Sequence, residues 1–123
     1  KAKIHGVFAH HTEDSIGVVV EYEGVCIYLV GDSLYHEKLL EVSELKPNIL
    51  ICCINGNLGN MNYREAANLA ISLGVQAAIP SHYGMVVENT EDPSKFLECL
   101  KNSSVKGLEL EYGIPQRVSN ILS

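Results

Sequence analysis

The chain has 123 residues, of which 46% are hydrophobic and 20% are charged, proportions typical of one globular unit and unlike disordered or fibrous chains. Its formal net charge is −6 and it contains no run of Lys or Arg, which argues against binding to nucleic acid. Its apolar runs are far shorter than a membrane span requires, so we expect no membrane segment and a cytoplasmic location.

The first part of the chain predicts three strands and a helix. Apolar runs predict the strands at residues 3–9, 16–21 and 25–30. Gly24 separates the last two, which we expect to form a β-hairpin. Apolar residues between Leu39 and Leu45 then recur at helical spacing, and Lys46-Pro47 ends that helix.

The rest of the chain predicts strands that alternate with helices. A continuous apolar run predicts a buried strand at residues 49–54, a further short buried strand is expected at 75–80, and alternation predicts a half-buried strand at 105–111. A helix is expected to begin at Asn62, three residues before Glu65, and another at Asp92-Pro93. This order is typical of parallel crossover units, so the fold class is α/β, in one unit over residues 1–123.

Three polar positions come directly after predicted strands: the pair His10-His11, Asp32 and His82. Open α/β sheets bind ligands beyond the carboxyl ends of their strands, so we expect these side chains to lie close together. Singly, Asp32 is as well explained as a turn residue and His82 as a hydrogen-bonded loop histidine. Together they are ligands that zinc, manganese and iron accept, and three ligands with open positions indicate a catalytic site. Adjacent strand residues point to opposite faces, so one histidine of the pair is expected to face the site.

The loop from Asn55 to Asn62 is rich in Asn and Gly and leads into a helix N-terminus, where free amides can hold a phosphate or carboxylate. A turn that needs positive φ angles explains the same composition equally well. Asn55, Asn60 and Tyr83 are the candidates for hydrogen bonds to a substrate. Cys52 and Cys53 lie in an apolar run and are poor candidates for a nucleophile.

Four segments resemble the metallo-β-lactamase-fold hydrolases and, among them, the L-ascorbate-6-phosphate lactonase-like branch. The family's Ala-x-His ligand segment is similar to Val7-Phe8-Ala9-His10-His11, and its strand ending in Gly-Asp-Thr/Ser is similar to residues 27–33. The branch's Asn-Gly-rich loop resembles residues 54–62, and its last ligand segment resembles Ile79-Pro80-Ser81-His82-Tyr83-Gly84.

The resemblance implies a role for each candidate ligand. It selects His11 rather than His10, makes Asp32 a carboxylate that can bridge two metals, and makes His82 a terminal ligand. It also implies a divalent metal, zinc or manganese, with two ions in the complete domain. The implied function is a metal-dependent hydrolase of a small anionic lactone or phosphate ester.

The chain departs from the family in one respect, because it contains no His-x-His-x-Asp-His string. The resemblance therefore implies the C-terminal half of an αββα metallo-β-lactamase-type sandwich, inactive in isolation. An apolar sheet face of such a half would be bare, so we expect an N-terminal half or a homo-oligomer partner to cover it. The missing string also favours an alternative, a non-catalytic half-domain that serves as an interaction or assembly module.

Overall fold

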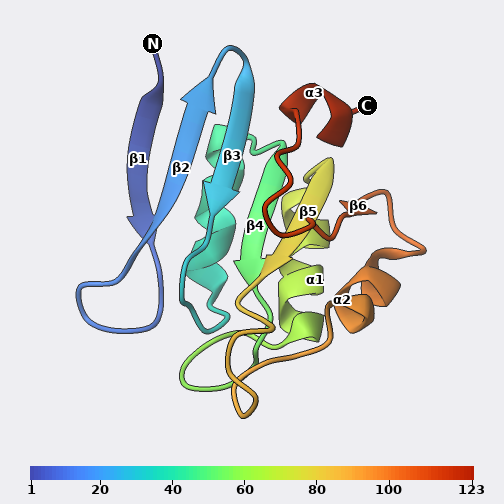
Figure 1. Cartoon of the computed structure of the whole chain (residues 1–123). Coiled ribbons are helices and arrows are strands. Elements are labelled where there is room, and N and C mark those ends of the chain that lie inside the picture. The colour runs from blue at the N-terminus through green and yellow to red at the C-terminus, as the bar shows by residue number, and fades with distance from the viewer.

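The computed structural model describes all 123 residues and contains one six-stranded sheet whose strands lie in chain order (Figure 1). The strands are β1 (Lys3–Phe8), β2 (Ile16–Tyr22), β3 (Val25–Leu29), β4 (Ile49–Cys53), β5 (Ala77–Ser81) and β6 (Lys106–Gly107). Strands β1, β2 and β3 pair antiparallel, and β3 to β6 pair parallel. The predicted α/β class and the β2–β3 hairpin are therefore confirmed.

The helical elements are a 3₁₀ helix η1 (Glu37–Leu45) and the α-helices α1 (Tyr63–Leu73), α2 (Pro93–Leu100) and α3 (Val118–Ile121). Helix α1 begins as predicted, because the Asn62 side chain accepts a hydrogen bond from the Glu65 amide and the Glu65 carboxylate accepts one from the Asn62 amide. It ends at Gly74, whose φ of 66° suits glycine. No helix is long and apolar enough to cross a membrane.

Two predicted elements differ from the structure. The helix expected near residues 39–45 is a 3₁₀ helix, and its apolar residues Leu39, Val42 and Leu45 are three apart, the period at which side chains of a 3₁₀ helix align. The strand expected at 105–111 is wrong beyond Gly107. The Leu108 amide still donates to the Ala78 carbonyl of β5, and residues 109–111, which are exposed, form no strand.

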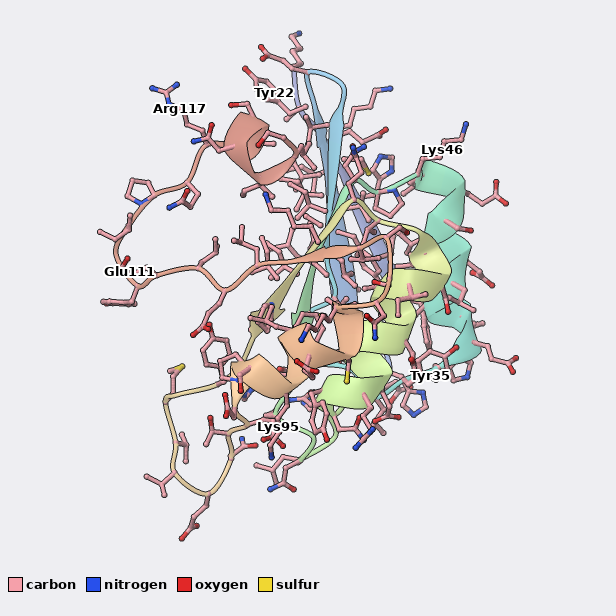
Figure 2. The ribbon with its side chains drawn as sticks, turned by 90° about the vertical axis from the view of Figure 1, so that its right-hand side faces the viewer. Tyr22, Tyr35, Lys46, Lys95, Glu111 and Arg117 are labelled. Carbon is pink, nitrogen blue, oxygen red and sulfur yellow. The ribbon has the colours of Figure 1, made fainter.

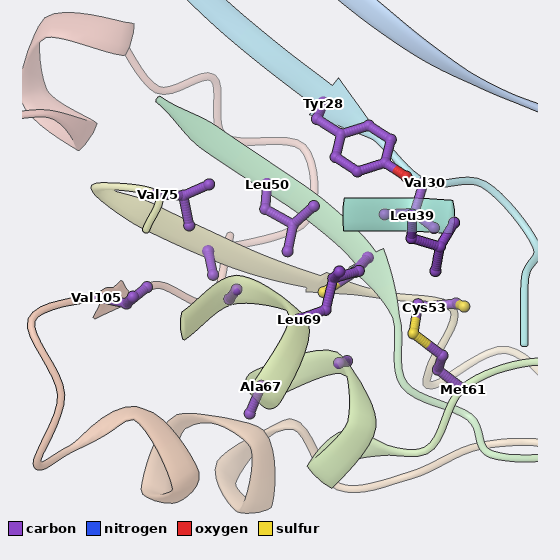
Figure 3. Packing of buried hydrophobic residues seen from close by; sticks show 14 of the residues in the cluster. Tyr28, Val30, Leu39, Leu50, Cys53, Met61, Ala67, Leu69, Val75 and Val105 are labelled. Atoms are coloured by element: carbon purple, nitrogen blue, oxygen red, sulfur yellow. The ribbon is translucent and has the colours of Figure 1, made fainter. Parts of the chain in front are cut away.

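The main core lies between the sheet and η1, α1 and α2, which all cover one face of the sheet (Figures 1 and 2). Its largest fully buried side chains include Tyr28, Leu50, Leu69 and Phe96, and Figure 3 shows Tyr28 and Leu50 on strands and Leu69 on helix α1 within this core. The strands of this core end at the loops in the lower part of Figure 1. The packed sheet therefore fixes where those loops begin.

The opposite face of the sheet is covered only in part. The C-terminal segment crosses it and packs α3 against β4 and β5, where Ile121 joins Ile49, Ala77 and Ile79 in the second cluster (Figure 1). On β1 and β2 the same face carries exposed apolar residues, namely Ile4 (72% exposed), Ile16 (62%) and Tyr22 (53%). We call these three, with the half-buried Val18 and Val20, the bare sheet face.

Candidate metal-binding site

The loops that follow β1, β3, β4 and β5 gather at one end of the sheet (Figure 1). Asp32 follows β3 and His82 follows β5, two strands that pair with β4 on either side in parallel register. The Asp32 Oδ1 and His82 Nε2 atoms are 3.4 Å apart, and both side chains are partly exposed. The expected proximity of Asp32 and His82 is confirmed, and their role as metal ligands stays a prediction.

His82 adopts a left-handed backbone conformation, with a φ of 62°. An L-residue with a side chain adopts this region at a cost of about 1–2 kcal/mol. Residues held in such conformations cluster at functional sites, where the surrounding structure maintains them. The strand that carries His82 therefore ends in a strained turn at the point where the imidazole meets Asp32.

His11 and His10 occupy different surroundings. The Nδ1 of His11 lies 3.0 Å from the carbonyl oxygen of Gly59, so Nδ1–H donates to that oxygen and Nε2 keeps its lone pair. Metal-bound histidines commonly have this arrangement, in which a backbone carbonyl fixes the tautomer. The ring of His10 instead stacks on His36, with centroids 5.3 Å apart and the rings 17° from parallel. These surroundings favour His11, the choice that the resemblance implies.

The structure brings together two of the three predicted ligands. No group of three or more His, Cys, Asp or Glu side chains is placed to hold one metal ion. His11 therefore does not join Asp32 and His82 in one cluster of ligands. The expected convergence of the three side chains is found only for Asp32 and His82. As a ligand, His11 remains a prediction.

The geometry of the Asp32–His82 pair fits a divalent cation. An ion with four tetrahedral ligands at ~2.1 Å separates its ligand atoms by ~3.4 Å, and the observed Oδ1–Nε2 separation is 3.4 Å. One carboxylate oxygen and one imidazole nitrogen thus lie at a spacing that a divalent cation can accommodate.

An open hollow of about 440 Å³ adjoins the pair. Its lining residues are Gly31, Asp32, Cys53, Ser81, His82, Tyr83, Met85, Val86 and Asn89. None of them is Lys or Arg, so no side chain of the lining carries a fixed positive charge. Burial, and then the charge of Glu109, raise the pKa of Tyr83, so its hydroxyl stays protonated at neutral pH and can donate a hydrogen bond.

Asn55 and Asn60, the other predicted substrate contacts, are almost fully buried at 6% and 5% exposure. The Nδ2 of Asn60 donates to Asp32 Oδ1 at 3.3 Å, and the Nδ2 of Asn55 donates to Asn89 Oδ1 at 2.7 Å. The side-chain oxygens of both asparagines have no hydrogen-bond partner. Their amide groups therefore hold the site together and leave two acceptors free.

The sequence interpretation assigned no role to Ser33, which is fully buried beside Asp32. Its hydroxyl accepts from the His10 amide at 3.0 Å and donates to the Leu34 carbonyl at 2.7 Å. Its carbonyl accepts from the Met61 amide at 2.8 Å. Ser33 thus joins the loops after β1, β3 and β4. The sequence feature that could have identified Ser33 is its position in the Gly-Asp-Ser segment at the end of a strand.

The cysteines differ in burial, and this predicts their reactivity. Burial raises the pKa of the Cys52 and Cys53 thiols, so little reactive thiolate forms at pH 8, and more forms only as the pH rises toward the raised values. Cys99 is half-buried and free. We expect Ellman's reagent to modify Cys99 first and the buried thiols only after unfolding. A Cys99→Ser variant should lack the fast phase, and a second fast thiol in that variant would contradict this expectation.

No family model matches the chain. Among curated proteins it is 33% identical over 97 residues to a UPF0173 metal-dependent hydrolase of Alkaliphilus metalliredigens, a match that covers 77% of this chain and 42% of that protein. It is 29% identical over 108 residues to a UPF0173 metal-dependent hydrolase of Sulfurisphaera tokodaii, covering 87% of this chain and 48% of the relative. The chain therefore spans less than half the length of these two relatives.

Two solved structures have a fold similar to that of this chain. A metallo hydrolase of the archaeon Ignicoccus hospitalis superposes with a TM-score of 0.81 at 22% identity, covering 92% of this chain and 51% of that one. The metallo-β-lactamase fold protein YhfI of Bacillus subtilis superposes with a TM-score of 0.71 at 20% identity, covering 92% and 48%. The sheet and its helical layer are therefore those of the metallo-β-lactamase fold.

The names of the sequence relatives are more specific than the similarity in fold. The two described above carry the same name, UPF0173 metal-dependent hydrolase. The resemblance to metallo-β-lactamase-fold hydrolases is thus confirmed at the level of fold and of named relatives. None of these names refers to the lactonase-like branch, which remains a prediction.

Proposed function

We propose that this chain forms part of a metal-dependent hydrolase that acts on a small anionic lactone or phosphate ester, in the manner of the L-ascorbate-6-phosphate lactonase-like branch. The observation that carries the proposal is the pairing of Asp32 Oδ1 with His82 Nε2 at 3.4 Å, at the carboxyl ends of two strands that flank β4. The names of the curated relatives support the reaction class. The resemblance of the loop segments supports the substrate class.

In this proposal His11, Asp32 and His82 hold the metal, zinc or manganese, with two ions in the complete domain. Bound there, a divalent ion acidifies water and polarises a carbonyl or phosphoryl oxygen. The hollow beside the pair has no Lys or Arg in its lining. The positive charge that attracts an anionic substrate is then that of the metal itself.

The chain's own polar groups orient the substrate. The Tyr83 hydroxyl lines the hollow and, with its raised pKa, acts there as a donor. Asn55 and Asn60 are the other proposed substrate contacts, and their side-chain oxygens are buried without a hydrogen-bond partner. In this proposal Asp32 and His82 are metal ligands, and no residue of this chain is assigned as a general base.

Residues 1–123 form the C-terminal half of the domain in this proposal, and an N-terminal half or a second copy of the chain covers the bare sheet face. Exposed Ile4, Ile16 and Tyr22 support it, because isolated proteins seldom leave such a contiguous apolar patch in water. The covering segment then supplies the remaining metal ligands. Four free cysteines support a reducing, cytoplasmic compartment.

The alternative is a non-catalytic half-domain that acts as an interaction or assembly module. One observation favours it, namely that no group of three potential ligands forms within the chain. The names of the curated relatives favour the hydrolase instead. We therefore keep the hydrolase as the proposed function.

Hydrolysis assays with and without metal test the proposed function. The protein at its natural length is purified, stripped with a chelator and assayed on phosphorylated sugar lactones, unphosphorylated lactones and chromogenic phosphate monoesters. We expect turnover of an anionic substrate that is lost on chelation and restored by Zn²⁺ or Mn²⁺. Retention of neither ion, with no hydrolysis of any substrate in the panel, would favour the interaction module.

A further inference from the structure

We propose that three consecutive residues, Gly59, Asn60 and Met61, position the metal ligands, each by a separate contact with the loops that carry them. We call them the bracing segment. The inference rests on the proposed function, because it assigns these residues to the same metal site. It adds positioning residues that act through His11 and Asp32.

The first contact orients His11. The Gly59 carbonyl accepts the His11 Nδ1–H at 3.0 Å, which leaves Nε2 as the free ring nitrogen. A side chain at residue 59 is incompatible with this approach, since an added Cβ would lie 2.9 Å from His11 Nδ1 and 3.2 Å from its Cε1. The φ of Gly59, 85°, also requires glycine. The imidazole therefore packs directly on the peptide backbone of residue 59.

The second contact orients Asp32. The buried Asn60 amide donates to Asp32 Oδ1 at 3.3 Å, on the same oxygen that faces His82. The Oδ1 of Asn60 itself is buried without a partner, which destabilises the fold relative to an apolar side chain of similar size. Packing alone therefore does not explain an asparagine at this position. The reason for an asparagine here is its hydrogen bond to the Asp32 carboxylate.

The third contact anchors the segment. The Met61 amide donates to the Ser33 carbonyl at 2.8 Å, and the Met61 side chain is fully buried, close to Cys53 in the core (Figure 3). Asn62 follows at once as the N-cap of α1. The bracing segment is thus fixed at one end to the core and helix, and its other two residues reach His11 and Asp32.

Binding of Co²⁺ alone tests the inference, with affinity and the visible absorption of the bound ion as readouts. In the protein at its natural length, Asn60→Leu keeps the side-chain volume and removes the amide. We expect a 10- to 100-fold weaker affinity, about the loss seen when a hydrogen-bond partner of a metal ligand is removed, and an altered Co²⁺ spectrum. The stability of the metal-free protein should be equal or higher, a combination that a purely structural role does not produce.

Gly59→Ala is expected to weaken Co²⁺ binding as well, by displacing His11. The matched control lies in the same loop: Asn62→Ala removes the helix cap, and Asn62 touches no proposed ligand. It should lower stability and leave Co²⁺ affinity intact. The inference is overturned if Asn60→Leu binds Co²⁺ as tightly as the wild type, or if Asn62→Ala loses as much affinity. Absence of Co²⁺ binding by the wild type would instead remove the proposed function and the bracing role together.

Discussion

The His82→Gly variant is expected to lose metal without losing its fold. The backbone at residue 82 has a φ of 62°, a conformation that glycine adopts without strain. The free energy of unfolding of the metal-free protein should therefore stay within about 1 kcal/mol of the wild type. Metal affinity should fall by more than about 100-fold, beyond the loss that follows removal of an outer partner. Metal analysis after dialysis and denaturant unfolding measure the two quantities.

Asp32→Ala should give the same loss of metal, because it removes the carboxylate that faces His82 Nε2. Two control substitutions remove the same side-chain types elsewhere on the molecule. His36→Ala removes a ring that stacks on His10, and Asp14→Ala removes an exposed carboxylate. Both controls should retain metal. Undiminished metal in His82→Gly and Asp32→Ala would refute their assignment as ligands.

The 123-residue chain, produced on its own, is expected to self-associate through the bare sheet face. Ile4, Ile16 and Tyr22 leave apolar side chains in water on one face of β1 and β2, and burial of such surface drives association. We expect light scattering to give a mass above that of the monomer at micromolar concentration. The double variant Ile4→Lys/Ile16→Lys should shift the chain toward the monomer, since both positions are already exposed and accept a charge without loss of core packing.

Ile71→Lys is the matched control for this experiment. Ile71 is an exposed apolar residue of α1, on the helical side of the sheet, so its substitution should leave self-association unchanged. A stable monomer of the unmodified chain would count against a partner for the bare sheet face. In the protein at its natural length, or with its partner, the Ile4→Lys/Ile16→Lys change should instead weaken assembly.

The proximity of Asp32 and His82 could be predicted from the sequence because it follows from topology. Both residues end strands with continuous apolar runs, such strands are parallel in α/β folds, and their carboxyl ends meet at one edge. Helix α1 was equally predictable, since its cap residues Asn62, Glu65 and Gly74 act within one or two turns. Local chemistry and strand direction were sufficient for these features.

Contacts between distant loops could not be predicted in the same way. The choice between His10 and His11 depends on the carbonyl of Gly59, which lies 48 residues away in the chain. The length of β6 depends on how far the chain stays hydrogen-bonded to β5, which the alternation of residues 105–111 does not reveal. Nor does the sequence reveal that the Asn60 amide reaches Asp32, which lies in a different loop.

The buried hydroxyl and carbonyl of Ser33 also affect the dynamics of the site. Binding loops generally belong to the least stable parts of a protein and open without global unfolding. Here the loops after β1, β3 and β4 share hydrogen bonds at one residue, Ser33, which has no solvent exposure. Separating these loops would break the buried hydrogen bonds of Ser33, so we expect them to open together rather than one at a time. A ligand at this end of the sheet should then meet these three loops already in place.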